Sequence, residues 1–288
     1  MFLPRPQLGS IAQRGPRAAG CLAALALLVG GCDSLENARG TNSLLTVFSA
    51  PPPGEAARWA TDPWNADRRA QGTLLLAARP FAGEPVYMAL FRDRLGDPDG
   101  NVRVAAVRAI AAHGEPDIAV DLAGMMLDDP EPLVRLEAAK AMQRLHNPLV
   151  VPMLLRALRV PSELAPERGG EPDPRVRTEV ADALGQYAEA RVVNALIESL
   201  HEDRRLSVQA RAAGSLSTLT GQDFGYDYRT WTAWFATVRE PFAAQRAYVY
   251  PVFDRDRTFF EHFPLVPDPP NEPAASPVGL SPSPVASR

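Results

Sequence analysis

The chain has 288 residues, of which 46% are hydrophobic and 7% aromatic, and this composition predicts a folded body with a sizeable core. Its 30 Lys and Arg residues are outnumbered by 34 Asp and Glu residues, which gives a formal net charge of −4. This charge excludes a nucleic-acid partner held by bulk electrostatic attraction.

The first 32 residues have the composition of an export signal. They contain three arginines, no acidic residue and an apolar run over residues 18–29 that is too short to span a bilayer comfortably. The run ends in the sequence LVGGC at residues 28–32, which resembles a bacterial lipobox with valine where leucine is usual. The resemblance implies that residues 1–31 are removed as a signal peptide and that Cys32 is lipidated. An ordinary secretory signal or an uncleaved anchor is the alternative.

Lipidation of Cys32 would hold the exported chain in the cell envelope. The next residue, Asp33, resembles the inner-membrane retention signal of enteric bacteria, so the periplasmic face of the inner membrane is favoured over the outer membrane. That rule varies between bacterial groups, and the choice of membrane stays open. Residues 32–54 are then the lipidated N-terminus and a proline-rich tether. The chain has no cysteine after Cys32, so the body has no disulfide framework.

Four stretches further along the chain repeat one another. They begin at Val102-Arg103, Val134-Arg135, Val176-Arg177 and Val208-Gln209, which are 32, 42 and 32 residues apart. Small or apolar residues recur at positions 4, 7 and 8 after each valine, and the eleventh position mostly follows, which is the spacing of one helix face. Each stretch is therefore expected to be a helix with one buried face.

An acidic turn precedes each of these helices, and a second apolar helix precedes the turn. The acids of the turns include Asp97, Asp129, Asp173 and Asp203. Such an acid can accept hydrogen bonds from the free amides of the first turn and offset the helix dipole. The apolar helices are expected over residues 86–95, 118–127, 149–158 and 192–200. One pair of helices cannot bury its own apolar face, so the pairs are expected to stack.

This pattern resembles HEAT repeats, particularly the short bacterial type found in phycobilisome-lyase-like repeat proteins. The resemblance covers residues 85–219, with a degenerate further unit at 59–82. It implies an all-α fold, an α-α superhelix (a HEAT-like solenoid) with irregular, partly disordered termini. It also implies a ladder of ion pairs and hydrogen bonds formed by Arg103, Arg135 and Arg177 with Asp97, Asp129, Asp173 and Asp203. Gln209 breaks the arginine column in the last unit, as an end repeat can.

The repeat domain is expected to span residues 55–238 and to end in an aromatic cap. Trp231, Trp234 and Phe235 have helical spacing and would close the apolar flank of the last unit. Residues 239–263 are expected to pack against the body in irregular form. Residues 264–288 are rich in proline and serine and are expected to be disordered.

The favoured function is a noncatalytic scaffold, because stacked helices present an extended surface to a protein or peptide partner. The 42-residue spacing marks an insertion at residues 159–172, and loops on one edge of a solenoid are frequent binding elements. Glu163, Glu167 and Arg168 are its candidate binding residues. Neutral drift explains a single surface insertion about equally well.

The alternative function is an enzyme or an enzyme accessory factor of lyase-like or metal-dependent type. Some HEAT-like oxygenases hold iron with repeated His-Glu pairs, and His201-Glu202 is a single such dyad. One dyad supplies too few ligands for a metal site, and the sequence has no recognisable nucleophile elbow or phosphate-binding glycine loop. No catalytic residue, metal or other cofactor is therefore expected.

Overall fold

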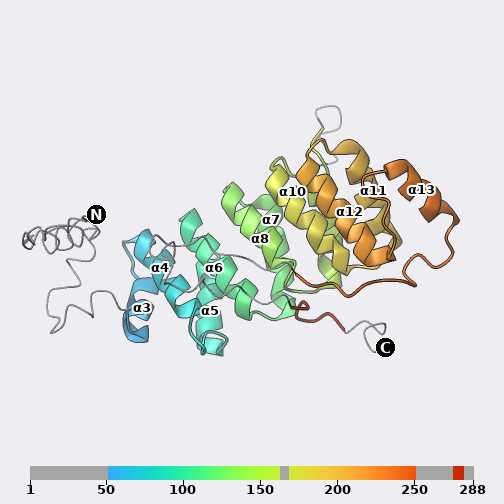
Figure 1. Cartoon of the computed structure of the whole chain (residues 1–288). Coiled ribbons are helices and arrows are strands. Elements are labelled where there is room, and N and C mark those ends of the chain that lie inside the picture. The colour runs from blue at the N-terminus through green and yellow to red at the C-terminus, as the bar shows by residue number, and fades with distance from the viewer. Residues whose placement is uncertain (1–50, 163–168, 251–274, 282–288) are drawn as a thin grey trace, which may run out of the picture. The chain divides into compact units, whose positions relative to one another are not determined.

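The computed structural model describes residues 51–162, 169–250 and 275–281 (Figure 1). The chain divides into two compact units, Met1–Pro52 and Pro53–Arg288, and every described helix belongs to the second. The predicted signal peptide and Cys32 lie outside the described residues. The described part of the second unit is an all-α solenoid, as predicted, with eleven α-helices, three short 3-10 helices and one isolated β-bridge.

Ten of the helices form five hairpins that follow one another along the chain (Figure 1). The hairpins pair α3 (Pro53–Ala60) with α4 (Ala66–Ala77), α5 (Pro85–Arg94) with α6 (Gly100–His113), α7 (Ala119–Asp128) with α8 (Pro132–Ala141), α9 (Val151–Leu158) with α10 (Pro174–Ala183), and α11 (Ala190–Glu202) with α12 (Leu206–Thr220). The second helices α4, α6, α8, α10 and α12 contact one another in that order, and the first helices α7, α9 and α11 do the same. The result is two layers of helices, and the degenerate N-terminal unit is a complete hairpin.

Acidic side chains in the turns within the hairpins accept hydrogen bonds from the first N–H groups of the second helices. The Asp99 carboxylate accepts from the backbone N–H groups of Asn101 and Val102 before α6, and Asp173 accepts from Arg175 N–H before α10. Proline occupies the start of α8 and α10, where no helical partner for its missing N–H is needed. Short 3-10 helices lead into α7 (η2, Pro116–Ile118) and α9 (η3, Pro148–Val150), and a third follows α10 (η5, Leu184–Gln186).

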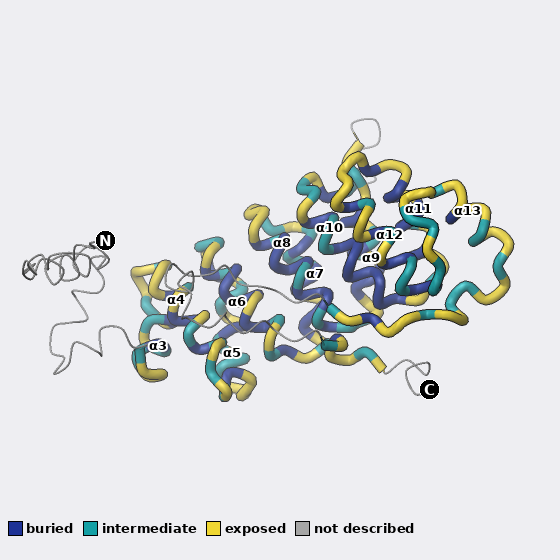
Figure 2. Tube along the Cα trace, in the orientation of Figure 1, coloured by how far each residue is buried: buried dark blue, intermediate teal, exposed yellow. Residues whose placement is uncertain are grey.

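The core lies between the two layers and follows the repeated columns of small and apolar residues. In the four units that begin with valine, this valine and the residues four and eight positions after it are fully buried; they are Val102, Ala106, Ile110, Val134, Ala138, Met142, Val176, Val180, Leu184, Val208, Ala212 and Leu216. Figure 2 shows buried stretches, in dark blue, on helices of both layers. Burying one such leucine or valine contributes about 1.5–3 kcal/mol, so the stacking of hairpins stabilises each of them.

A final helix, α13 (Tyr228–Thr237), covers the end of the first-helix layer by packing on α11. Trp231 is fully buried there, and its indole N–H donates to the Gly225 carbonyl at 3.0 Å. The Phe224 ring meets the Trp231 ring edge-on, with centroids 4.8 Å apart. The aromatic segment therefore lies where a sixth hairpin would otherwise stack.

The C-terminal segment runs back along the second helices. Residues 239–250 are irregular, and the side chain of Tyr248 within this stretch is buried. Residues 251–274 and 282–288 lie outside the described residues. The prediction that the whole of 264–288 is disordered is wrong for residues 275–281, because Val278 forms a parallel β-bridge with Leu145 in the turn after α8.

Candidate functional site

The predicted arginines link neighbouring hairpins in one repeated geometry. Arg103 on α6 donates to both carboxylate oxygens of Asp129 in the next hairpin, at 2.9 and 2.8 Å. Its remaining terminal nitrogen donates to the Asp97 carbonyl, six residues back in its own turn, at 2.9 Å. One planar guanidinium thus joins two successive turns, which suits its fixed fork of donors.

The same two-sided contact recurs in the next two hairpins. Arg135 donates to the Glu171 carboxylate at 2.9 and 3.2 Å and to the Asp129 carbonyl at 2.9 Å. Arg177 donates to the Asp203 carboxylate at 2.7 Å and to the Glu171 carbonyl at 2.6 Å. These contacts form a continuous chain from one hairpin to the next, and we call it the arginine ladder.

The ladder acids also close their own turns. Each carboxylate accepts a hydrogen bond from the backbone N–H two residues further on: Asp97 from Asp99 at 3.0 Å, Asp129 from Glu131 at 2.9 Å, Glu171 from Asp173 at 2.8 Å and Asp203 from Arg205 at 2.9 Å. Because the same group fixes the turn and receives the arginine, the turn is preorganised for the neighbouring hairpin.

The assignment of Asp173 to the ladder is wrong, because Glu171 holds that position. Asp173 caps α10 and pairs with Arg175, whose side chain is 65% exposed. The ladder acid always lies six residues before the arginine or glutamine whose side chain binds its carbonyl, and only Glu171 has that spacing from Arg177.

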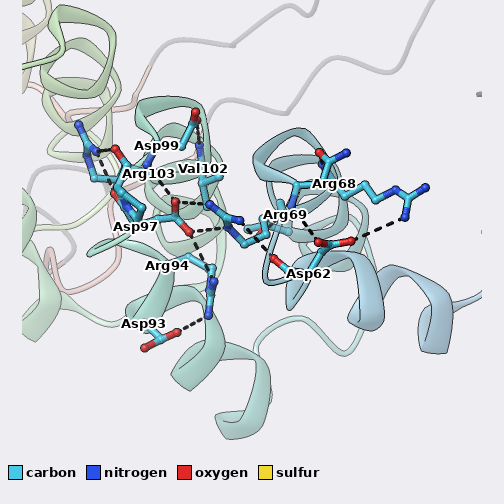
Figure 3. A network of polar contacts seen from close by, with 12 residues as sticks. Asp62, Arg68, Arg69, Asp93, Arg94, Asp97, Asp99, Val102 and Arg103 are labelled. Carbon is cyan, nitrogen blue, oxygen red and sulfur yellow. Dashed lines mark hydrogen bonds and ion pairs between the residues drawn. The ribbon is translucent and has the colours of Figure 1, made fainter.

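The ladder has a further member on α4 that the repeat pattern did not reveal. Arg69 donates to both oxygens of Asp97, at 2.7 and 2.9 Å, and Arg94 approaches the same carboxylate at 3.4 Å (Figure 3). Arg68 precedes it where the other units have valine, so the Val-Arg signature is absent. No constant interval points to Arg69, since it lies 28 residues before its acid, whereas Arg103 lies 26 residues before Asp129 and Arg135 lies 36 before Glu171.

The ladder pairs are mostly buried. Their arginine side chains are 5–13% exposed and their acids 1–7%. Burial alone would favour neutral Asp97, but the hydrogen bond from Arg69 contributes to holding the pKa of Asp97 below its ordinary value. The hydrogen bond to Asp97 likewise raises the pKa of Arg69, and the bond to Asp129 raises the pKa of Arg103. These charges are engaged in holding hairpins together.

The two ends of the ladder differ from its interior. Gln209 takes the place of arginine in the last hairpin, and its amide donates to the carbonyls of Asp203 at 2.9 Å and Leu200 at 3.1 Å. It keeps the contact within its own turn and carries no charge for a further carboxylate. At the other end, the Asp62 carboxylate accepts from the Trp64 and Asn65 N–H groups, and these bonds lower its pKa.

A second set of polar contacts joins neighbouring hairpins outside the ladder. Arg108 pairs with Glu137 at 3.0 Å, Gln143 donates to Glu179 at 2.7 Å, and Arg211 pairs with Asp182 at 2.9 Å. Both acids at the charged pairs, Glu137 and Asp182, are buried. Burial raises the pKa of Asp182, and the charge of Arg211 opposes that rise.

The candidate binding residues Glu163, Glu167 and Arg168 lie outside the described residues, but both ends of their insertion are described. The Glu171 N–H donates to the Arg159 carbonyl at 3.2 Å and closes the base of the insertion. A pocket of about 260 Å³ lies beside this base, between α9 and α11. Its lining combines an apolar part with a charged and polar part; the residues include Leu155, Leu158, Val160, Ala195, Arg191 and Glu198.

The histidine of the His-Glu dyad packs against an aromatic ring. The His201 ring centroid lies 4.3 Å from that of Tyr228, at the start of the capping helix α13. Among residues 51–162, 169–250 and 275–281, no group of three or more His, Cys, Asp and Glu side chains is placed to hold a metal ion. Within the same ranges, no helix combines the length and apolar character needed to cross a membrane.

Residues 88–166 match the family described as HEAT repeats. The chain is also similar to the X-ray structure of YibA from Escherichia coli, with 17% identity, a TM-score of 0.45, and coverage of 73% of this chain and 77% of that one. No curated protein matches the chain. The matched HEAT repeats include α6, α7, α8 and α9, and hence the ladder residues Arg103 and Arg135.

Proposed function

We propose that this chain is a noncatalytic scaffold that binds a protein or peptide partner, held at the periplasmic face of a membrane by lipid on Cys32. Its HEAT repeats are of the short bacterial type found in phycobilisome-lyase-like proteins, without the lyase chemistry. HEAT repeats commonly mediate protein–protein contacts, and the match over residues 88–166 supports this class of function.

The observation that carries the proposal is the pocket between α9 and α11. Its volume of about 260 Å³ suits one side chain of a partner better than a whole metabolite. Leu155 and Ala195 supply apolar surface, while Arg191 and Glu198 supply charge beside it. A pocket that offers apolar surface with charged groups beside it can receive an anchoring side chain of a partner protein.

Site-specific photocrosslinking in cells tests the scaffold function. A probe at Asn194, an exposed residue that lines the pocket, should yield a discrete crosslinked product, and the same probe at exposed Ala210 on α12 should not. Filling the pocket with Ala195→Trp should remove the Asn194 product. Equal labelling from both positions, or a purified chain that carries stoichiometric metal or a chromophore, would contradict the proposal.

The anchor is tested separately. Cys32→Ser should abolish labelling by a radioactive fatty acid and leave a precursor that retains residues 1–31, because the signal peptidase for lipoproteins acts at the modified cysteine. Normal fatty-acid labelling of the variant would refute lipidation at Cys32. Fractionation of the wild-type envelope then assigns the inner or outer membrane, of which we propose the inner.

A further inference from the structure

The C-terminal segment contacts the second helices of three successive hairpins, in the reverse of their chain order. The Arg246 N–H donates to the Thr218 carbonyl on α12 at 2.8 Å. The Tyr248 hydroxyl lies 3.2 Å from the Asp182 carboxylate on α10, and the ring itself is buried. Residues 275–281 then contact the turn after α8. The ends of α8, α10 and α12 thus form one edge that carries a chain segment along it (Figure 1).

The contact at the turn after α8 uses backbone groups of both segments. The Val278 N–H donates to the Arg144 carbonyl at 2.8 Å, and the His146 N–H donates to the Val278 carbonyl at 2.9 Å. The side chain of Val278 is 48% exposed, so its backbone makes the contact. Addition of an extended peptide to unpaired backbone groups is a common mode of peptide recognition.

The receiving turn is held rigid without the peptide. The Asn147 side chain donates to the Pro116 carbonyl at 2.8 Å and accepts from the Leu149 N–H at 3.0 Å. The Tyr187 hydroxyl donates to the Asn147 carbonyl at 3.3 Å from the next hairpin. The His146 N–H and the Arg144 carbonyl therefore keep their positions when the bridge opens, and a preorganised site loses less entropy on binding.

The residue after Val278 has a steric requirement. Gly279 has φ of +89°, and a β-carbon there would lie 2.6 Å from Pro116 Cγ and 2.9 Å from the His146 carbonyl oxygen. Any other residue would be strained and would push the segment away from the turn. The tail contains the same three preceding residues twice, as Ser276-Pro277-Val278 and again at residues 283–285, but alanine follows the second copy.

We propose that the turn after α8 is a binding site for an extended Pro-Val-Gly peptide, and that residues 275–281 occupy it as an intramolecular ligand that a partner peptide displaces. Two backbone hydrogen bonds hold Val278 at the turn, and a third joins the Tyr250 N–H to the Ala275 carbonyl at 3.1 Å, whereas Tyr248 remains anchored by its buried ring. The site lies on the second-helix side and is independent of the pocket between α9 and α11, so either can fail without the other.

The test uses the full chain and a labelled heptapeptide with the sequence of residues 275–281. In the wild type the tail competes at a millimolar effective concentration, so binding measured by fluorescence anisotropy should be at least about tenfold weaker than to Gly279→Ala. The matched control is Gly225→Ala, where φ is +53° but a β-carbon meets no atom within 4 Å; it should behave as the wild type. A heptapeptide with alanine for glycine should not bind.

Hydrogen exchange supplies a readout that does not depend on the peptide label. The His146 amide should exchange faster in Gly279→Ala than in the wild type and should be protected again when the unlabelled heptapeptide is added. Unchanged exchange in the variant, equal binding of the alanine peptide, or equal binding to wild type and variant would each overturn the proposal. A wild-type chain that is a dimer and becomes monomeric in Gly279→Ala would overturn the intramolecular arrangement.

Discussion

Arg175 and Arg177 lie two residues apart on α10, and only Arg177 belongs to the ladder. Arg177 is 5% exposed and Asp203 is 1% exposed, whereas Arg175 is 65% exposed beside Asp173. A buried ion pair that loses one partner leaves an uncompensated charge in the interior, which costs far more than the loss of a solvated pair. Two nearby arginines on one helix therefore make different contacts: Arg177 forms a buried ion pair, and Arg175 forms an ion pair at the surface.

Arg177→Ala should destabilise the protein by about 3–5 kcal/mol, because Asp203 is left buried without its cation. Arg175→Ala should cost less than about 1 kcal/mol and is the control for the change in helix propensity and the lost charge. Chemical denaturation followed by circular dichroism measures both values. Equal losses in the two variants would show that burial does not set the strength of these pairs.

His146 provides a pH dependence with a defined direction. Burial lowers the pKa of its imidazole below 6.5, its Nδ1 has no hydrogen-bond partner, and its ring stacks on Tyr187 with centroids 4.8 Å apart. The unfolded chain therefore binds a proton at a higher pH than the folded one does. The contribution of His146 to the free energy of unfolding is therefore full above the pKa that this residue has in the unfolded chain, and it is lost as the pH falls below that pKa.

Between pH 7.5 and 5.5 the wild type should consequently lose more stability than His146→Phe, which keeps an aromatic ring and cannot titrate. The measurement is the difference between the two denaturation midpoints across that pH range, so that carboxylates common to both proteins cancel. A difference that stays constant with pH would show that His146 titrates alike in the folded and unfolded states.

At the scale of elements, the sequence predicts the helices well and the contacts between them less completely. The columns that begin at Val102 and Val134 locate the second helices because their burial repeats with helical spacing. Glu171 was missed because it lies within the predicted insertion at residues 159–172, and the acid nearer to α10, Asp173, has the more familiar role of a helix cap. Only the constant six-residue interval to the carbonyl-binding side chain distinguishes the two acids.

Other features depend on tertiary contacts that no local pattern encodes. Arg69 follows another arginine in place of valine, so its ladder role appears only when Asp97 is placed beside it (Figure 3). The buried carboxylate of Asp182 accepts a hydrogen bond from the hydroxyl of Tyr248, 66 residues away in the chain. Residues 275–281 are ordered by backbone pairing, which their proline- and serine-rich composition does not predict.

The packing between helices predicts the effect of a charge at a core column. Ala138 on α8 is fully buried, so Ala138→Asp should bury an unpaired carboxylate and unfold much of the array. Ala210→Asp, at an exposed position on α12, should change stability by less than about 1 kcal/mol. Helical circular dichroism and thermal melting compare the two. Unchanged melting of Ala138→Asp would contradict the alignment of the repeats.

Across the whole described solenoid, the ladder has two distinct ends. Every ladder arginine binds a carboxylate in the hairpin that follows. The ladder therefore begins at Arg69 and ends at Asp203, because the uncharged Gln209 binds only within its own turn. A linear array of this kind derives its stability from the hairpins and from the interfaces between neighbours. The arginine ladder supplies the polar share of those interfaces, while the valine and alanine columns supply the apolar share.

A double-mutant cycle on Arg103 and Asp129 tests the coupling of neighbouring hairpins most directly. The two residues lie in successive hairpins and share a two-point contact at 2.9 and 2.8 Å. Denaturation of the wild type, Arg103→Ala, Asp129→Ala and the double variant should give a coupling energy of at least about 1 kcal/mol. A coupling energy within about 0.3 kcal/mol of zero would contradict the central claim that the ladder holds the hairpins together.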